Sequence, residues 1–235
     1  MISLYFEQVD DASHRYGPGS PESVAAIAEV DGWIGRLLDG IDAIAIGPRV
    51  HVVVVSDHGQ LNYRDDPEPF ILSEVIGLDG VTVVDGHSHA LLYVADGNLA
   101  HARKLRDAIN AEWQHGRAWL RDEAPVEWQG RGSERLGDVL LQADPGYVVV
   151  STERLLPIRN RGTHGWSPET SEMQGIFIAA GPRLPAGKVL DTVHATDIYP
   201  LLLELLGLPD RRNPAPRSPL CELLGSSAAC ARPGL

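Results

Sequence analysis

Apolar and polar residues follow two different periods along the chain. Residues 19–41, "GSPESVAAIAEVDGWIGRLLDGI", place apolar side chains three or four positions apart behind Ser20 and Pro21, which predicts an amphipathic helix. Residues 50–59, "VHVVVVSDHG", begin with a continuous β-branched run, which is typical of a strand covered on both faces of a parallel sheet. Residues 1–10, "MISLYFEQVD", also have the pattern of a buried strand. Strand, helix and strand in this order predict an α/β fold with a mostly parallel central sheet and flanking helices.

The middle of the chain has shorter elements. Further strands are predicted at residues 81–86, 89–95, 146–150 and 173–182, and further helices at residues 98–113 and 195–209. We therefore expect one domain of residues 1–210 that contains a small α+β insertion at about residues 80–150. Residues 211–235, rich in Pro, Ser and Ala, predict a loosely ordered tail.

The composition argues against a nucleic-acid polymer or a membrane as the binding partner. The 235 residues carry a formal net charge of -12, which argues against a grip on a nucleic-acid polymer, because phosphates are neutralised by clustered Lys and Arg. No run approaches the roughly 18 apolar residues of a membrane span, and no signal-peptide pattern is visible, so we expect no membrane partner. Cys221 and Cys230 could form a disulfide or remain two thiols, and the sequence leaves this open.

Polar residues with metal-binding chemistry follow the predicted strands. In open α/β sheets, ligands bind beyond the carboxyl ends of the strands, so these positions are the first candidates for a site. Asp10 and His14, four residues apart, would share one side of a helical turn. The other candidates are Asp57 and His58 after the valine run, and His164 in a Gly-flanked loop. All five side chains can reach one edge of one sheet.

Imidazole and carboxylate together are ligands for zinc, at about 2.0–2.2 Å. Three histidines and two aspartates are too many for one tetrahedral ion. Two ions about 3.5–4 Å apart would use all five and would suit displacement at phosphorus. Because two aspartates leave two dications with excess positive charge, such a site favours a small anionic ligand such as a phosphoester.

Each candidate also has a plainer interpretation. Asp57, His58 and Gly59 could form a turn in which Gly59 supplies a positive φ. Asp10 and His14 could be a solvated pair on a helix, and His164 a loop histidine without a ligand role. We expect the remaining histidines to be surface or structural: His51, His87, His89, His101, His115 and His194. The "HSH" spacing of His87 and His89 is a weak alternative for a metal site.

Three segments resemble a known family when taken together and in order. Residues 5–18, "YFEQVDDASHRYGP", 52–61, "VVVVSDHGQL", and 162–182, "GTHGWSPETSEMQGIFIAAGP", resemble the last three metal-binding motifs of the type I phosphodiesterase and nucleotide pyrophosphatase family, in the alkaline phosphatase superfamily. The resemblance continues to about Pro209. It implies an alkaline-phosphatase-like fold whose N-terminal part is missing here.

The resemblance also implies ligand roles. Asp10, His14 and His164 match the ligands of one zinc ion. Asp57 and His58 match ligands of the second zinc ion. The expected cofactors are therefore two zinc ions, with an incomplete second site, because a further family aspartate lies upstream of these motifs.

The implied activity is hydrolysis of phosphodiester or pyrophosphate bonds through an activated Thr or Ser nucleophile. That nucleophile lies upstream of the matched motifs in the family, so we expect no catalytic nucleophile in this chain and little or no turnover by it alone. The substrate would be a small phosphoester such as a nucleotide. Alternatives are a phosphonate or phosphomonoester hydrolase of the same superfamily, and a noncatalytic remnant that binds zinc or a partner. Family members are commonly periplasmic or extracellular; the compartment and the oligomeric state stay open.

Overall fold

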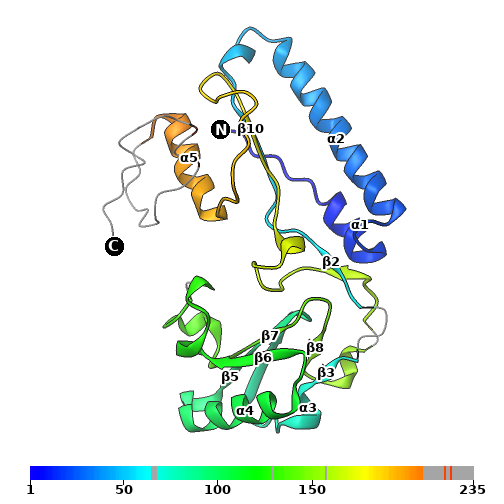
Figure 1. The fold of residues 1–235 in the computed structure, drawn as a ribbon, viewed down its shortest axis with the longest axis vertical. Coiled ribbons are helices and arrows are strands. Elements are labelled where there is room, and N and C mark those ends of the chain that lie inside the picture. The colour runs from blue at the N-terminus through cyan, green and yellow to red at the C-terminus, as the bar shows by residue number, and fades with distance from the viewer. Residues whose placement is uncertain (65–67, 129, 157, 209–219, 221–222, 224–235) are drawn as a thin grey trace. The chain divides into compact units, whose positions relative to one another are not determined.

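The computed structural model describes residues 1–64, 68–128, 130–156 and 158–208, together with Leu220 and Leu223 (Figure 1). The chain forms two compact units. The first contains residues 1–32 and 58–174, and the second contains residues 33–57 and the described residues from 175 onward. Apart from Leu220 and Leu223, the predicted tail lies outside the described residues, as do Cys221 and Cys230. The predicted single domain with an insertion stays a prediction.

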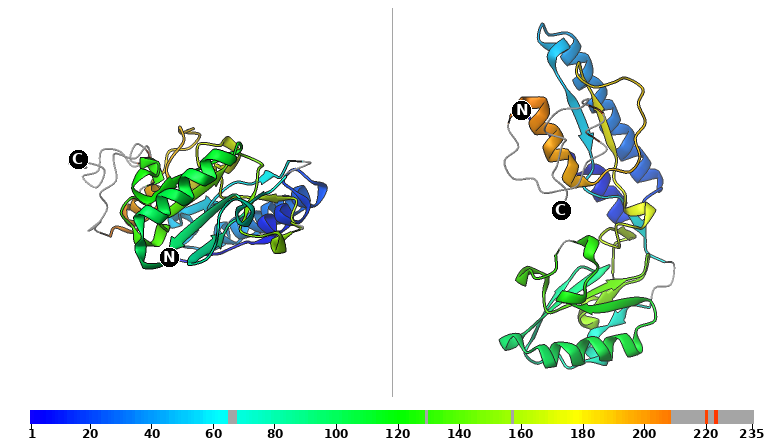
Figure 2. Two further views of the ribbon diagram at one scale, coloured as in Figure 1. Left: turned by 90° about the horizontal axis from the view of Figure 1, so that it is seen from below. Right: turned by 60° about the vertical axis from the view of Figure 1, so that its left-hand side comes forward.

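An antiparallel four-stranded sheet with one helix forms the core of the first unit. The strand order is β4 (Val81–Asp85), β5 (His89–Val94), β7 (Val139–Ala143) and β6 (Gly116–Leu120). Helix α4 (Leu99–Glu112) lies along one face of this sheet (Figures 1 and 2).

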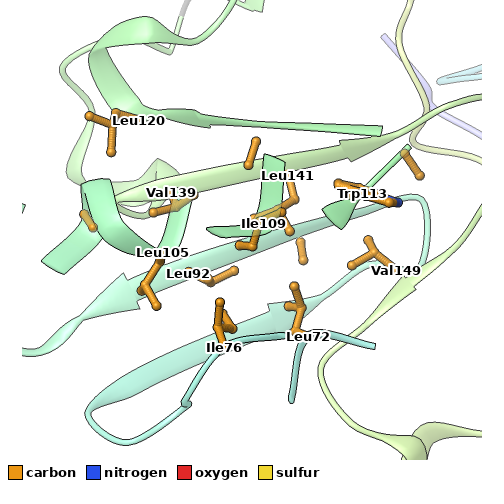
Figure 3. Close-up of a cluster of buried hydrophobic side chains, with 14 of the residues drawn as sticks. Leu72, Ile76, Leu92, Leu105, Ile109, Trp113, Leu120, Val139, Leu141 and Val149 are labelled. Atoms are coloured by element: carbon orange, nitrogen blue, oxygen red, sulfur yellow. The ribbon is translucent and has the colours of Figure 1, made fainter. Parts of the chain in front are cut away.

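Alternation along β5 explains this packing. Ala90, Leu92 and Val94 are buried, whereas the residues between them are partly exposed, as expected of a strand with one face in a core. Leu92 and Leu141 from the sheet meet Ile109 from α4 in the hydrophobic cluster (Figure 3). Each of these three side chains is at most 1% exposed.

Shorter elements complete the first unit. Strand β3 (Phe70–Ile71) pairs parallel with β8 (Val149–Val150) and leads into α3 (Leu72–Val75). Strand β2 (Leu61–Asn62) pairs antiparallel with β9 (Gly162–Thr163). Helix α1 (Gln8–Tyr16) is tied to β9, because the main-chain N–H of Arg161 donates to the carbonyl of His14 at 2.8 Å.

The predicted strand at residues 1–10 is wrong. Residues 1–7 have no regular secondary structure, and α1 begins at Gln8. Met1 and Ile2 are 86% and 89% exposed. An apolar run indicates a tendency to be buried, but a strand also needs a neighbour to pair with, and none of the described strands pairs with this segment.

Helix α2 (Pro21–Asp42) confirms the first helical pattern. Ser20 caps it, since its Oγ accepts a hydrogen bond from the N–H of Ser23 at 3.1 Å. The apolar stripe is only partly covered: Val24 and Ile27 are 55% and 53% exposed.

Strand β1 (Val52–Val55) pairs antiparallel with β10 (Phe177–Ala180) in the second unit, and the two extended ribbons run side by side in Figure 1 and in the right-hand view of Figure 2. The second unit also contains α5 (Ile198–Leu206), which ends at Gly207 in the left-handed conformation with φ 68°. Leu201 of α5 packs with Leu220 and Leu223.

The predicted parallel pairing of the valine run is wrong for the neighbour that the described residues provide, because β1 runs antiparallel to β10. Among the described strands β3 and β8 form a parallel pair, whereas β1 and the four-stranded sheet are antiparallel. A run of valines indicates burial and extended backbone, but it does not fix the direction of the neighbouring strand. Burial was also overestimated, because Val55 is 44% exposed.

Short 3-10 helices connect these elements. Their bounds are Gly47–Arg49, Ala95–Gly97, Arg121–Glu123, Val126–Trp128, Glu134–Leu136, Glu153–Leu155, Ser171–Met173 and Ala195–Asp197. Within the part of the chain that the structure describes, no helix has the length and apolar character of a membrane span.

Candidate metal centre

Helix α1 presents Asp10 and His14 on one face. The Oδ2 of Asp10 lies 3.6 Å from the Nε2 of His14, as expected of residues four positions apart on a helix. The Nδ1 of His14 lies 3.0 Å from the carbonyl oxygen of Gly162 on β9. Because a carbonyl only accepts, Nδ1 carries the proton and Nε2 keeps its lone pair. The ring is therefore oriented by one nitrogen and available to a ligand at the other.

His164 brings a third donor to the same place from far along the chain. It follows β9 directly, and its ring meets that of His14 edge to face, with centroids 5.1 Å apart. The donor atoms of Asp10, His14 and His164 all lie within 4.8 Å of one another. These three residues are called the candidate cluster below.

His58 lies against the candidate cluster. Its ring stacks on that of His164 with centroids 3.6 Å apart and an interplanar angle of 14°. Its Nδ1 lies 3.0 Å from the carbonyl oxygen of Gly59, which directs Nε2 away from its own main chain. Asp57 precedes His58 in the sequence but belongs to the second unit, so its role as a ligand stays a prediction.

The candidate cluster has the donor types of a zinc site, at separations that small side-chain movements would bring to those of a bound ion. Two imidazole nitrogens and one carboxylate oxygen form the ligand set of an open catalytic zinc site, which keeps a fourth position for water or substrate. Ligands at about 2.0–2.2 Å from a tetrahedral ion are about 3.3–3.6 Å from each other. The 3.6 Å between Asp10 and His14 is close to this spacing, and small side-chain rotations would close the rest. The residues present fit the metal that the resemblance implies.

Gly59 has a packing role instead of the positive φ that a turn would require. It is not among the glycines with positive φ. Its N–H donates to the carbonyl of Met173 at 2.9 Å, and a Cβ at this position would clash with the carbonyl oxygen of Glu172 and lie 2.8 Å from that of Gln174. The motif requires glycine because another main-chain segment passes directly against it.

Three neutral side chains donate hydrogen bonds to the candidate cluster or to the loop that carries His164. Sequence analysis did not identify them. Gln60 donates from Nε2 to Oδ1 of Asp10. Ser88 is fully buried, and its Oγ donates to the carbonyl of His164 at 2.8 Å. Gln142 on β7 donates from Nε2 to the carbonyl of Gly165 at 3.2 Å. The two latter contacts tie the His164 loop to the four-stranded sheet.

His87 and His89 lie beside this loop but outside the candidate cluster. His87 has φ 60°, and its Nδ1 is 3.5 Å from the hydroxyl of Tyr63. Burial lowers the pKa of His89, and the neighbouring His87 lowers it further. Burial raises the pKa of Tyr63, partly offset by its hydrogen bond with Thr163. His89 therefore favours the neutral, structural state.

The lowered pKa of His89 predicts a dependence of stability on pH. The unfolded chain binds a proton at His89 near pH 6.5, whereas the folded chain does so only at lower pH. Below about pH 6.5 the unfolded state therefore gains protons first, and the free energy of unfolding falls as the pH is lowered. Urea unfolding of the chelator-treated protein between about pH 5 and 8 measures this. The H89Q variant should have a shallower slope, and an unchanged slope would contradict this role.

Comparison with known proteins identifies the family to which the chain belongs. Residues 1–167 match the model of the type I phosphodiesterase / nucleotide pyrophosphatase family, and the chain belongs to this family. The chain is 26% identical over 215 residues to bis(5'-adenosyl)-triphosphatase enpp4 of Xenopus laevis, covering 91% of this chain and 46% of that protein. It is 27% identical over 233 residues to human ectonucleotide pyrophosphatase/phosphodiesterase family member 7, covering 97% of this chain and 50% of that protein.

Solved structures support the same assignment. Murine ectonucleotide pyrophosphatase/phosphodiesterase 5 matches with a TM-score of 0.80 and 25% identity, over 89% of this chain and 55% of that one. Its inactive variant in complex with AMP matches with a TM-score of 0.84 and 25% identity, over 94% and 58%. The predicted alkaline-phosphatase-like fold is thereby confirmed as a partial fold. The chain spans about half the length of these relatives.

Proposed function

We propose that this chain carries the zinc-ligand part of a hydrolase of phosphodiester or pyrophosphate bonds. Asp10, His14 and His164 would hold one zinc ion, and Asp57 and His58 would contribute to a second, incomplete site. The observation that carries the proposal is the convergence of three donor atoms within 4.8 Å from two distant parts of the sequence. Family membership supports the reaction class.

Main-chain carbonyls orient two of the proposed ligands. His14 is oriented through Nδ1 by the carbonyl of Gly162, and His58 through Nδ1 by that of Gly59. Zinc in such a site supplies Lewis-acid stabilisation of charge that develops on phosphoryl oxygens. The substrate class we propose is a nucleotide, because relatives include a bis(5'-adenosyl)-triphosphatase and a protein solved with AMP.

We also propose that residues 1–235 do not include the nucleophile. The hydroxyl residues that adjoin the proposed ligands in the sequence are buried or already hydrogen-bonded. Ser13 is 5% exposed, on α1. The Oγ of Ser56 accepts a hydrogen bond from the N–H of Ile176 at 2.9 Å. Thr163 is 6% exposed and hydrogen-bonds to Tyr63. The chain alone should therefore turn over little or no phosphodiester.

Zinc titration combined with a chromogenic phosphodiester assay tests this proposal. We expect the purified chain to bind one zinc ion tightly and a second weakly, because a site with two protein ligands is too open for tight binding. Turnover should stay near the rate of the zinc-only blank. Turnover comparable to that of a complete relative would disprove the absence of the nucleophile, and a failure to bind zinc would disprove the metal site.

Binding of AMP separates the hydrolase part from a noncatalytic zinc-binding protein. By calorimetry, the zinc-loaded chain should bind AMP, and the chelator-treated chain should not, because the phosphate needs the metal charge. Adenosine, which lacks the phosphate, is the matched control. Equal binding of AMP with and without zinc, or no binding of AMP at all, would favour a noncatalytic zinc-binding protein.

A further inference from the structure

Gln60 reaches from the segment after His58 back to helix α1. Its side-chain Nε2 donates to Oδ1 of Asp10 and also lies 3.3 Å from the main-chain carbonyl oxygen of the same residue. A primary amide has two N–H donors, so Gln60 directs both of them at Asp10. One residue thus holds both the carboxylate and the backbone of a candidate ligand.

The contact leaves the two carboxylate oxygens of Asp10 in different environments. Oδ1 is occupied by Gln60, whereas Oδ2 lies 3.6 Å from Nε2 of His14. Only Oδ2 is therefore presented toward the other donors of the candidate cluster. A carboxylate held in this way offers one oxygen to a metal ion and cannot readily offer both.

We propose that Gln60 is a positioning residue that fixes Asp10 as a ligand through Oδ2 alone; this rests on the proposed zinc site. Hydrogen bonds to metal ligands set the orientation of the ligand before the metal arrives, and their loss typically costs about 10–100-fold in metal affinity. A neutral amide suits the task, because it orients the carboxylate without cancelling the negative charge that attracts the cation. Lys or Arg in this position would cancel it.

The orientation of the amide follows from its partners. If Oε1 faced Asp10, oxygen would oppose oxygen at both contacts, so Nε2 must face Asp10. Oε1 is then left buried and without a hydrogen-bond partner among the described residues. Such an atom carries a desolvation cost, which is tolerated here because the donors on the same amide bind a charged group.

The test compares Gln60→Met with Gln8→Met in the full chain. Met has a similar length but no N–H donors. Gln8 lies on α1 with Asp10, and its Oε1 is also buried with no partner among the residues that the structure describes, but it makes no hydrogen bond to Asp10, so it is a matched control. Competition with a chromogenic chelator should show about 10–100-fold weaker zinc binding for Gln60→Met. Gln8→Met should stay close to the wild type.

Cobalt substitution gives a readout that a purely structural role would not change. When Oδ1 is released, Asp10 can bind through both oxygens and raise the coordination number. The visible absorption bands of the Co²⁺-loaded Gln60→Met protein should therefore weaken relative to wild type and Gln8→Met. The melting temperature in chelator checks that all variants fold, and Gln60→Asn, too short to reach Asp10, should give the same loss of affinity.

The outcomes are distinguishable. Wild-type zinc affinity and an unchanged Co²⁺ spectrum in Gln60→Met would overturn the role of Gln60 while leaving the zinc site intact. An absence of zinc and cobalt binding by the folded wild-type chain would overturn the proposed metal site, and the role of Gln60 with it. Equal losses in Gln8→Met and Gln60→Met would show a general effect of substitution near α1 and would also overturn the role of Gln60.

Discussion

Replacing His164 by alanine is expected to abolish tight zinc binding. Structural zinc sites with four protein ligands bind with about 10–16 kcal/mol, so one ligand accounts for about 2.5–4 kcal/mol, or roughly a hundredfold or more in affinity. His164 should be at the upper end, because its ring contacts both His14 and His58. Its removal changes the environment of the whole candidate cluster. Chelator competition and elemental analysis of the purified variant measure the effect.

His101→Ala is the matched control for this substitution. His101 lies on α4, outside the candidate cluster, and the capping contact there uses its main-chain N–H, which alanine retains. Zinc affinity should remain that of the wild type. If His164→Ala and the wild type bind zinc equally, the ion lies elsewhere, and the proposed ligand set is wrong.

Short-range features of the site were predictable from the sequence. Asp10 and His14 could be paired in advance, because a spacing of four residues on a helix places two side chains on one face. The helices α2 and α4 were likewise predictable from apolar periodicity. In each case the geometry of a single element determines the result.

Contacts between distant segments were predictable only in part. That His164 lies near Asp10 could be predicted only from the order of the family motifs, because no local spacing rule relates residues so far apart in the chain. The direction of β1 was not predictable, because valines fit parallel and antiparallel neighbours equally well. The prediction of a strand at residues 1–10 failed for a related reason, because apolar side chains do not indicate whether a pairing strand is available.

The residues that support the ligands leave the weakest signal in the sequence. Gln60, Ser88 and Gln142 act through ordinary hydrogen bonds to a carboxylate or to main-chain carbonyls. Glutamine and serine occur throughout protein surfaces and have no spacing rule that marks such a role. Only the folded chain shows that Ser88 is completely buried and directed at the His164 loop.

Replacing Gly59 by alanine is expected to destabilise the first unit and disturb the metal site together. The added Cβ would clash with the main-chain oxygen of Glu172, and backbone cannot rotate away as a side chain would. Overpacking of this kind costs about 1–3 kcal/mol or more. The strain falls on the carbonyl of Gly59 that orients His58, so zinc affinity should fall as well. Urea unfolding in chelator and zinc competition on the same samples measure both effects.

Gly32→Ala provides the opposite expectation within the same protein. Gly32 lies inside α2 with open space around its Cα, and alanine there should raise the free energy of unfolding by about 0.5–1 kcal/mol through its better helix propensity. The sign of the effect therefore separates a glycine needed for close approach from one that is merely tolerated. Equal stability of Gly59→Ala and wild type would mean that the crossing segment at Glu172 moves freely, and that the conformation of the His58 motif does not depend on it.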